Sequence, residues 1–388
     1  MTPTPTVTPL PWEKAKSFKL QVLRSCCDWP FSGGSQPDSV LTVGIYSVTM
    51  SPVLNVVLFG FDDSGRRFHF QAVLKLYDRR FGERLRRYRG EHVPHTAERE
   101  LAFQSFVRRG MMARFLRQGA EDPEVGDEQR QGAKTPEDLV SAQLPLSPRN
   151  KDSKPNAEFE AAVWEECEKN FNCETQAYER LKDLQGKSMP RMYAHVRLLL
   201  PIPNVPQDLL DSPDTARYFE VKGVILERVP GYPLYDLPTS HLAPSNMELW
   251  AGIVQAAVEA VHEIDSRGVL NNNCSPYNIV VNCNSHTPFI IDFASCWFKE
   301  QMIQQWKENG RMDDDDDPDI EYWEEVVTAN NEGAIGEVMT ARLRQMKGLE
   351  LNIRYPNSEK ILEDMKRSKG IESIKDRAGT SGWKKLYF

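Results

Sequence analysis

Apolar side chains recur along this chain with two different periods, and each period predicts a type of secondary structure. Between about residues 39 and 77, stretches rich in Val, Leu and aromatic residues are separated by the turn signal DDSGR, and FHFQAVLKLY alternates with period two. These patterns predict three consecutive antiparallel strands. Similar stretches at 192–200 and 218–229 predict two further strands.

Helical spacing of apolar residues dominates the rest of the chain. Residues recurring at steps of three and four predict a long helix over 158–184 and shorter helices over 246–266 and 332–347. A β-rich part is thus followed by an α-rich part, and the breaker-rich sequence VPGYP lies between them. We therefore expect an α+β protein with two lobes that join near 227–233 and a cleft between the lobes.

Length and composition favour a globular protein inside the cell. The 388 residues are 40% hydrophobic, which is enough for one large core or two medium ones. No apolar run approaches the roughly 18 to 20 residues of a membrane span, and Met1 to Leu10 alternates Thr and Pro where a signal peptide would be apolar. Seven cysteines without a CxxC pair indicate a reducing compartment, cytoplasmic or nuclear, and no structural zinc.

Charge is unevenly distributed along the chain. Lys and Arg total 48 against 56 Asp and Glu, so the net charge of −8 argues against nucleic acid as the main partner. Residues 79–117 hold eleven basic and four acidic side chains, whereas 311–325 hold one basic and nine acidic. Either segment could contact a protein partner, but a solvated helix face is the favoured interpretation of 79–89, and a flexible linker that of 313–317. Residues 118–156 have few large apolar groups and are expected to be a disordered insertion.

The most informative segment for chemistry is GVLNNNCSPYNIVVNCNSHTPFIIDFAS, residues 268–295. The runs IVV and FII, separated by a polar turn, predict a β-hairpin, which would bring Asn278 beside Asp292. An amide oxygen and a carboxylate at a cleft edge suit Mg²⁺, which takes few protein ligands and completes its shell with phosphates and water. The alternative is that Asn278 caps a turn and Asp292 is a solvated strand end.

Two further charged residues stand out against apolar patterns. Lys75 shares one strand face with Val73 and Tyr77, so its ammonium should emerge from a partly apolar surface, although exposed lysines on strands are common. Glu174 lies on the apolar stripe of the predicted helix 158–184, where a carboxylate needs a cationic partner unless it reaches solvent at the stripe margin.

These signals, taken in order, resemble the protein-kinase-like superfamily over roughly residues 39–300. AVLKLY resembles the strand whose lysine contacts the α and β phosphates, and CETQAYERL resembles the helix whose glutamate positions that lysine. LERVPGYPL resembles the hinge, and AVHEIDSRGVLNNNCSPYN with IIDFAS resembles the catalytic loop and the metal-binding strand. The resemblance implies an ATP site with Lys75, Glu174, Glu227 and Val229, and a Mg²⁺ site with Asn278 and Asp292.

The departures from the family fall on catalysis. Asn273 stands in place of the catalytic aspartate, and an amide cannot take up a proton near neutral pH, so a rate loss on the order of 100- to 10,000-fold is expected. Asn271 stands in place of the loop's histidine, and no GxGxxG sequence follows the first strand to cradle phosphates. Val73 narrows the adenine slot, Ala294 replaces a glycine, and no APE motif follows Asp292.

The resemblance implies the following organisation: an N-terminal extension (1–38), a small lobe (39–229, with an insertion at 79–157), a large lobe (230–350) and a C-terminal tail (351–388). The antiparallel β-rich small lobe and the mainly α-helical large lobe would enclose a nucleotide. We expect a catalytically impaired, pseudokinase-like regulatory or binding module that binds ATP and Mg²⁺. A slow ATP-dependent phosphotransferase acting on a protein or small-molecule hydroxyl, and a scaffold that binds no nucleotide, are the alternatives.

Overall fold

The chain folds into helices and antiparallel sheets, which confirms the predicted α+β class. The structure is a computed structural model that describes residues 17–27, 29, 38–50, 53–61, 67–82, 85–88, 90–120, 156–199 and 205–370. The chain divides into two compact units: unit 1 holds Met1–Phe171, Met192–Glu227 and Tyr387–Phe388, and unit 2 holds Asn172–Arg191 and Arg228–Leu386. Most of the predicted disordered insertion, residues 121–155, lies outside the described residues.

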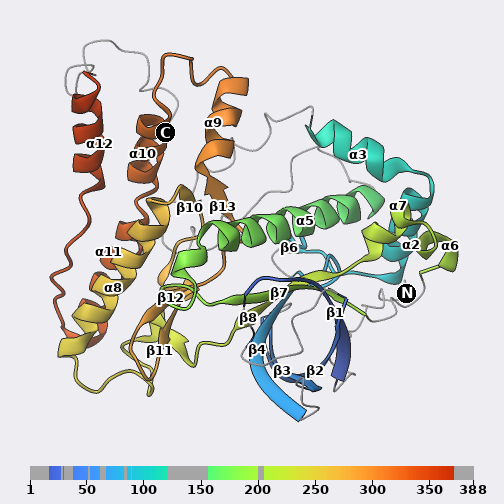
Figure 1. The fold of residues 1–388 in the computed structure, drawn as a ribbon, viewed down its shortest axis with the longest axis horizontal. Helices are drawn as coiled ribbons and strands as arrows, with labels where there is room; N and C mark the ends of the chain where they lie inside the picture. The colour runs from blue at the N-terminus through green and yellow to red at the C-terminus, as the bar shows by residue number, and fades with distance from the viewer. Residues whose placement is uncertain are drawn as a thin grey trace. The chain divides into compact units, whose positions relative to one another are not determined.

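Unit 1 is built on a closed barrel of six antiparallel strands (Figure 1). The barrel order is β1 (Ser17–Ser25), β2 (Val40–Met50), β3 (Val53–Phe61), β4 (Arg67–Tyr77), β8 (Lys222–Glu227) and β7 (Met192–Leu198). The five strands predicted from the sequence are present. The sixth, β1, lies in the segment expected to be an N-terminal extension, and it closes the barrel because it pairs with both β2 and β7. A closed barrel is not typical of a kinase small lobe.

Alternation of side chains along the strands creates the barrel core. Ala72, Leu74 and Leu76 of β4 are buried inside the barrel, while Val73 and Lys75 between them are half-buried on the other face. Strand β1 alternates in the same way, with its apolar side chains (Phe18, Leu20 and Val22) buried. Strands β1 and β4 therefore each contribute every second side chain to one continuous apolar core.

Short elements and three helices complete unit 1. Beside the barrel lie a small two-stranded sheet, helices α2 and α3, the first part of the long helix α5, and short helical turns; their bounds are β5 (Arg87–Tyr88), β6 (Glu91–His92), α2 (Ala97–Arg108), α3 (Met111–Ala120), α5 (Asn156–Arg180), α6 (Gln207–Leu210), α7 (Pro213–Ala216) and η3 (Arg217–Phe219). Helix α5 confirms the helix predicted over 158–184, and its last nine residues belong to unit 2.

The Arg-rich segment that follows β4 is partly internal, which corrects the interpretation of 79–89 as a solvated helix face. Arg79 and Arg86 are buried and share the carboxylate of Glu160, at N–O distances of 2.9 and 2.6 Å. Arg79 also pairs with Glu100 at 2.5 Å, and Arg80 pairs with Asp78 at 2.7 Å. Sequence composition indicates charge but not its partners, and these partners lie up to 81 residues away.

Electrostatics within this network favour the ionised carboxylates. Burial alone would raise the pKa of Glu100, but the Arg79 guanidinium and hydrogen bonds from His95 and Gln104 outweigh burial and hold that pKa far below its usual range. The opposing charges therefore compensate the cost of burying one another, and removing a single partner would leave an uncompensated charge.

Unit 2 consists mainly of helices with two small β-sheets. The helices are α8 (Glu248–Asp265), α9 (Lys299–Glu308), α10 (Pro318–Ala329), α11 (Asn331–Lys347) and α12 (Ser358–Ser368), with turns η2 (Lys182–Leu184), η4 (Leu234–Asp236) and η5 (Pro276–Asn278). Strand β11 (Ile279–Asn282) pairs with β12 (Pro288–Ile290) and β9 (Gly231–Pro233), and β10 (Val269–Asn271) pairs with β13 (Cys296–Phe298). Both predicted helices, over 246–266 and 332–347, are present. No helix among the described residues is both long and apolar enough to cross a membrane.

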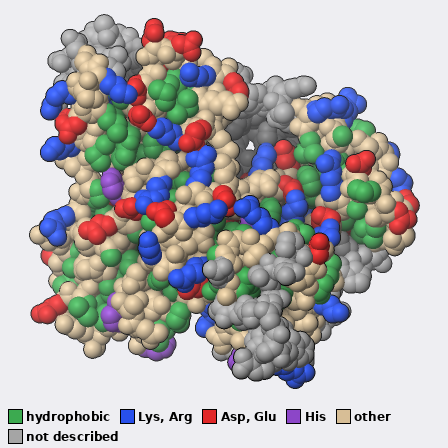
Figure 2. Space-filling view, in the orientation of Figure 1, with side chains coloured by type: hydrophobic (Ala, Val, Ile, Leu, Met, Phe, Trp, Pro, Cys, Tyr) green, Lys and Arg blue, Asp and Glu red, His purple; other side chains and the backbone are tan. Residues whose placement is uncertain are grey.

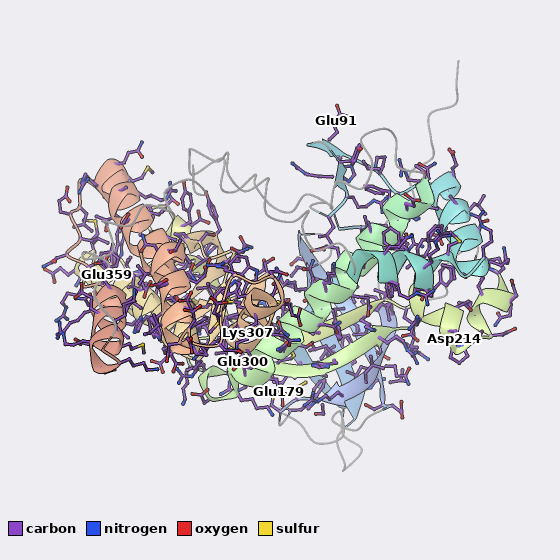
Figure 3. All side chains as sticks on the ribbon, turned by 90° about the horizontal axis from the view of Figure 1, so that it is seen from above. Glu91, Glu179, Asp214, Glu300, Lys307 and Glu359 are labelled. Carbon is purple, nitrogen blue, oxygen red and sulfur yellow. The ribbon has the colours of Figure 1, made fainter. Side chains whose placement is uncertain are left out.

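The acidic segment 311–325 is largely matched by basic groups of the same unit. Asp317 caps α10 by accepting hydrogen bonds from the backbone N–H groups of Asp319 and Ile320, and it pairs with Lys369. Glu324 pairs with Lys366, and Glu325 with Arg311. Acidic and basic side chains also lie close together on the face of the molecule that Figure 2 shows. Helix α9 carries both kinds, and Figure 3 labels Glu300 and Lys307 on it. The run 313–317 is a non-helical connection, and its last residue is the N-cap of α10.

Replacing Glu160 tests the buried charge network. Glu160→Gln keeps the shape of the side chain but leaves Arg79 and Arg86 without their shared anion, so we expect a loss of about 3–5 kcal/mol in the free energy of unfolding. Asp208→Asn is the control, because Asp208 pairs with Arg108 on an exposed surface and should cost less than about 1 kcal/mol. Urea unfolding followed by circular dichroism measures both, and equal losses would contradict a central role for Glu160.

Candidate functional site

Two loops of unit 2 lie side by side because they connect the same two strand pairs. The loop 272–278 leads from β10 to β11, and the loop 291–295 leads from β12 to β13. Since β10 pairs with β13 and β11 with β12, the two loops must run next to each other. The predicted hairpin is confirmed, with Ile279 opposite Ile290, and the Ile291 N–H donates to the Asn278 carbonyl at 2.9 Å.

Asn273 links the two residues that the sequence proposes as metal ligands. The Asn278 side-chain N–H donates to the Asn273 carbonyl at 2.9 Å, and the Asn273 side-chain N–H donates to Asp292 Oδ2 at 3.3 Å. All three side chains are half-buried. The site therefore combines one carboxylate with an amide donor directed at it, and Asn278 keeps Oδ1 as the atom that could bind a cation.

Asn271 connects the two loops through hydrogen bonds of its side chain. It is 3% exposed, accepts a hydrogen bond from the Asn273 N–H at 2.9 Å through Oδ1, and donates to the Asp292 carbonyl at 3.5 Å. In the structure, Asn271 bonds to both loops and fixes their separation.

Asp292 has a strained backbone. Its φ of 66° lies in the left-handed region, where non-glycine residues are uncommon, although Asp and Asn occur there more often than other residues. Such strain persists only when the surrounding structure holds it, and it concentrates at functional sites. The next residue, Phe293, is fully buried and packs edge-to-face against Tyr178 of α5, with ring centroids 5.6 Å apart.

Glu174 is fully buried, as its place on the apolar stripe of α5 predicts. It belongs to unit 2 together with the loop 291–295. Burial and the neighbouring Cys173 thiol raise the pKa of the Cys296 thiol, and the negative charges of Glu174 and Asp292 raise it further, so both carboxylates lie near Cys296. The unit thus brings Glu174, Asp292, Asn273 and Asn278 into one region.

The other predicted ligand-binding residues lie on or just after the barrel strands. Lys75 of β4 lies opposite Val53 and Val224, and its ammonium is 5.7 Å from the centroid of the Tyr77 ring. Glu227 ends β8, and Val229 follows it; both are half-buried. Lys75 and Glu227 belong to unit 1 and Val229 to unit 2, so the division between units falls within the predicted hinge.

The donor set matches a cation that brings most of its own ligands. Among the described residues, no group of three or more His, Cys, Asp and Glu side chains could hold a metal ion. Asn278 and Asp292 supply at most two hard oxygen donors, and only one of them is charged. This set fits Mg²⁺ bound together with phosphates and water, and it does not fit zinc or a closed protein-only site.

A buried polar cluster that the sequence did not reveal supports the loop 272–278 from behind. Cys274 contacts the Asn331 carbonyl through its sulfur at 3.8 Å, and the Asn331 side chain donates to Asp265 Oδ1 at 3.2 Å. Asp265 is fully buried, and its Oδ2 has no hydrogen-bond partner among the residues that the structure describes. Nearby Glu332 accepts from His262 and Ser358. Burial, followed by the charge of Glu332, raises the pKa of Asp265 well above its usual range.

Comparison with known proteins adds no assignment. No protein-family model matches the chain, and no curated protein matches it at a significant level.

Replacing Asp265 tests whether it is a buried acid. Because its folded-state pKa is raised, Asp265 contributes stability that is complete below its unfolded pKa and is lost as pH rises toward the folded value. Asp265→Asn cannot ionise, so the variant should gain stability relative to the wild type by up to about 1.4 kcal/mol per pH unit between pH 5 and 8. Urea unfolding at each pH measures the difference. The exposed Glu337→Gln is the control. If the stability difference between Asp265→Asn and the wild type did not change with pH, the assignment of Asp265 as a buried acid would be wrong.

Replacing Asn273 tests its contact with Asp292. Asn273→Asp exchanges the amide donor for a second carboxylate. Repulsion between the two carboxylates raises the pKa of one of them, and it destabilises the folded protein as pH rises from 5 to 8. We expect a loss of about 1–3 kcal/mol at pH 8 without divalent cations, and recovery with Mg²⁺. Thermal unfolding measures both. The exposed neighbour Asn272→Asp is the control, and equal behaviour of the two variants would argue against the contact.

Proposed function

We propose that this chain is a protein-kinase-like, nucleotide-binding protein with impaired phosphoryl transfer, which acts as a regulatory or binding module. The observation that carries the proposal is the meeting of Asn273, Asn278 and left-handed Asp292 on two adjoining loops of unit 2. Sequence reasoning placed a hydroxyl-orienting residue and two magnesium ligands at these positions. Backbone strain at Asp292 supports a functional role over that of a solvated strand end.

The proposed binding functions divide between the two units. Mg²⁺, when bound with ATP, would neutralise phosphate charge, and Asp292 with Asn278 Oδ1 would hold it. Lys75 projects from the outer face of the barrel, where a single ammonium could pair with the α and β phosphates. The resemblance gives Glu174 the role of positioning the lysine, and it gives the segment Glu227–Val229 the role of offering backbone groups to adenine. The two-lobed kinase-like arrangement belongs to this proposal.

Asn273 explains why binding is favoured over transfer. Its side-chain N–H group donates to Asp292, and its amide oxygen has negligible basicity near neutral pH. A hydroxyl could be oriented by this amide but could not lose its proton to it. Slow phosphoryl transfer, in which water takes the proton late in a loose transition state, is the alternative activity that the same site allows.

Nucleotide binding is tested by thermal unfolding of the full chain with ATP and Mg²⁺. At a ligand concentration of 100 times Kd, the stabilisation should reach about 2.7 kcal/mol. Lys75→Ala and Asp292→Asn should each abolish it, and asparagine is chosen because it tolerates the left-handed backbone. Lys19→Ala, on an exposed face of β1, and Glu337→Gln should leave it unchanged.

Turnover measured in the same samples separates the alternatives. If only the base is missing, Asn273→Asp should raise phosphoryl transfer by on the order of 100-fold or more, whereas a measurable wild-type rate would favour the slow phosphotransferase. Absence of any thermal shift at millimolar ATP would refute nucleotide binding and leave the scaffold.

A further inference from the structure

One sulfur atom joins α5 to the loop that carries Asp292. Cys173 and Cys296 are 123 residues apart in sequence, yet Cys173 Sγ lies 3.2 Å from both the backbone nitrogen and the carbonyl oxygen of Cys296. The same sulfur lies 3.4 Å from the Phe293 carbonyl oxygen. It therefore bridges the first and last residues of the turn 293–296, which directly follows Asp292. All these residues belong to unit 2.

The strand ladder leaves the Cys296 backbone available for this contact. The Asn272 N–H donates to the Ser295 carbonyl, and the Lys299 N–H donates to the Gly268 carbonyl. The backbone N–H and carbonyl groups of odd-numbered residues in 295–299 therefore point toward β10. Cys296 therefore directs its N–H and carbonyl away from β10, toward α5. Since Cys296 is 7% exposed, its N–H would be a costly unpaired donor without the sulfur.

The thiol suits both sides of this turn. A cysteine sulfur accepts a weak hydrogen bond while its single proton donates to one carbonyl at a time, here that of Phe293 or Cys296. Alanine or valine at position 173 would lose every one of these bonds, whereas a serine hydroxyl could replace them. The next residue on the helix is Glu174, which is fully buried.

We propose that Cys173 is a positioning residue for Asp292. Its thiol closes the turn 293–296 against α5 and so holds the left-handed Asp292 in the orientation that presents its carboxylate to a cation. The part of this inference that concerns the cation rests on the proposed function, and the part that concerns the loop does not.

Hydrogen exchange of the full-length protein tests the loop. In Cys173→Ala, which is smaller, and Cys173→Val, which is larger, exchange in the peptide 292–298 should accelerate about tenfold, and Cys173→Ser should restore it to within about threefold of the wild type. Cys167→Ala, a buried thiol on the same helix in unit 1, is the control and should leave this peptide unchanged. Exchange within twofold of the wild type in both Ala and Val variants would overturn the proposal.

Affinity for ATP with and without Mg²⁺ tests the cation. With Mg²⁺ present, the Ala and Val variants should bind ATP about fivefold or more weakly than the wild type. Without Mg²⁺, they should bind ATP as tightly as the wild type does. The Ser variant should recover the affinity that depends on Mg²⁺. Faster exchange with an unchanged Mg²⁺ dependence would show that Cys173 holds the turn but does not position Asp292. If the wild type binds no ATP, the proposed function fails, and the exchange result alone decides whether Cys173 holds the loop.

Discussion

Pairing between two short strand ladders is the constraint on which the candidate site depends. Strands β10 and β11 are connected by one loop, and their partners β13 and β12 are connected by the other. The backbone bonds of these ladders fix the two loops against each other before any side chain is chosen. Side chains on the loops can then vary while the backbone geometry that brings them together is kept.

Buried carboxylates have opposite electrostatic surroundings in the two units. In unit 1, guanidinium groups compensate Glu160 and Glu100, so these carboxylates stay ionised. In unit 2, Asp265 accepts from the neutral amide of Asn331 and lies near Glu332, so burial favours its protonated form. The first network resists change near neutral pH, whereas the second loses stability as pH rises. Because Cys274 joins the second cluster to the loop 272–278, the site rests on the more pH-sensitive support.

Regular periodicity explains what the sequence could predict. The five barrel strands, helices α5, α8 and α11 and the β11–β12 hairpin follow from apolar patterns that are local, and so does the burial of Glu174. Strand β1 also alternates, but its short pattern follows a Thr- and Pro-rich start, and only pairing with β2 and β7 gives it a role. The partners of Arg79, the support by Asn271 and the contacts of Cys173 are long-range. No local signal specifies which distant backbone atoms a sulfur or guanidinium will meet.

The side chains that surround Asp292 carry little charge of their own. Asn271, Asn273 and Asn278 are neutral, so Asp292 is the one carboxylate among these four side chains. An aspartate at position 273 would add a second negative charge about 3–4 Å away, which only a bound cation could compensate at low cost. The amide removes that repulsion and donates to Asp292 instead, so the loops can keep their geometry without a cation. An amide at position 273 therefore stabilises the two loops without a second carboxylate, and it offers no group that accepts a proton near neutral pH.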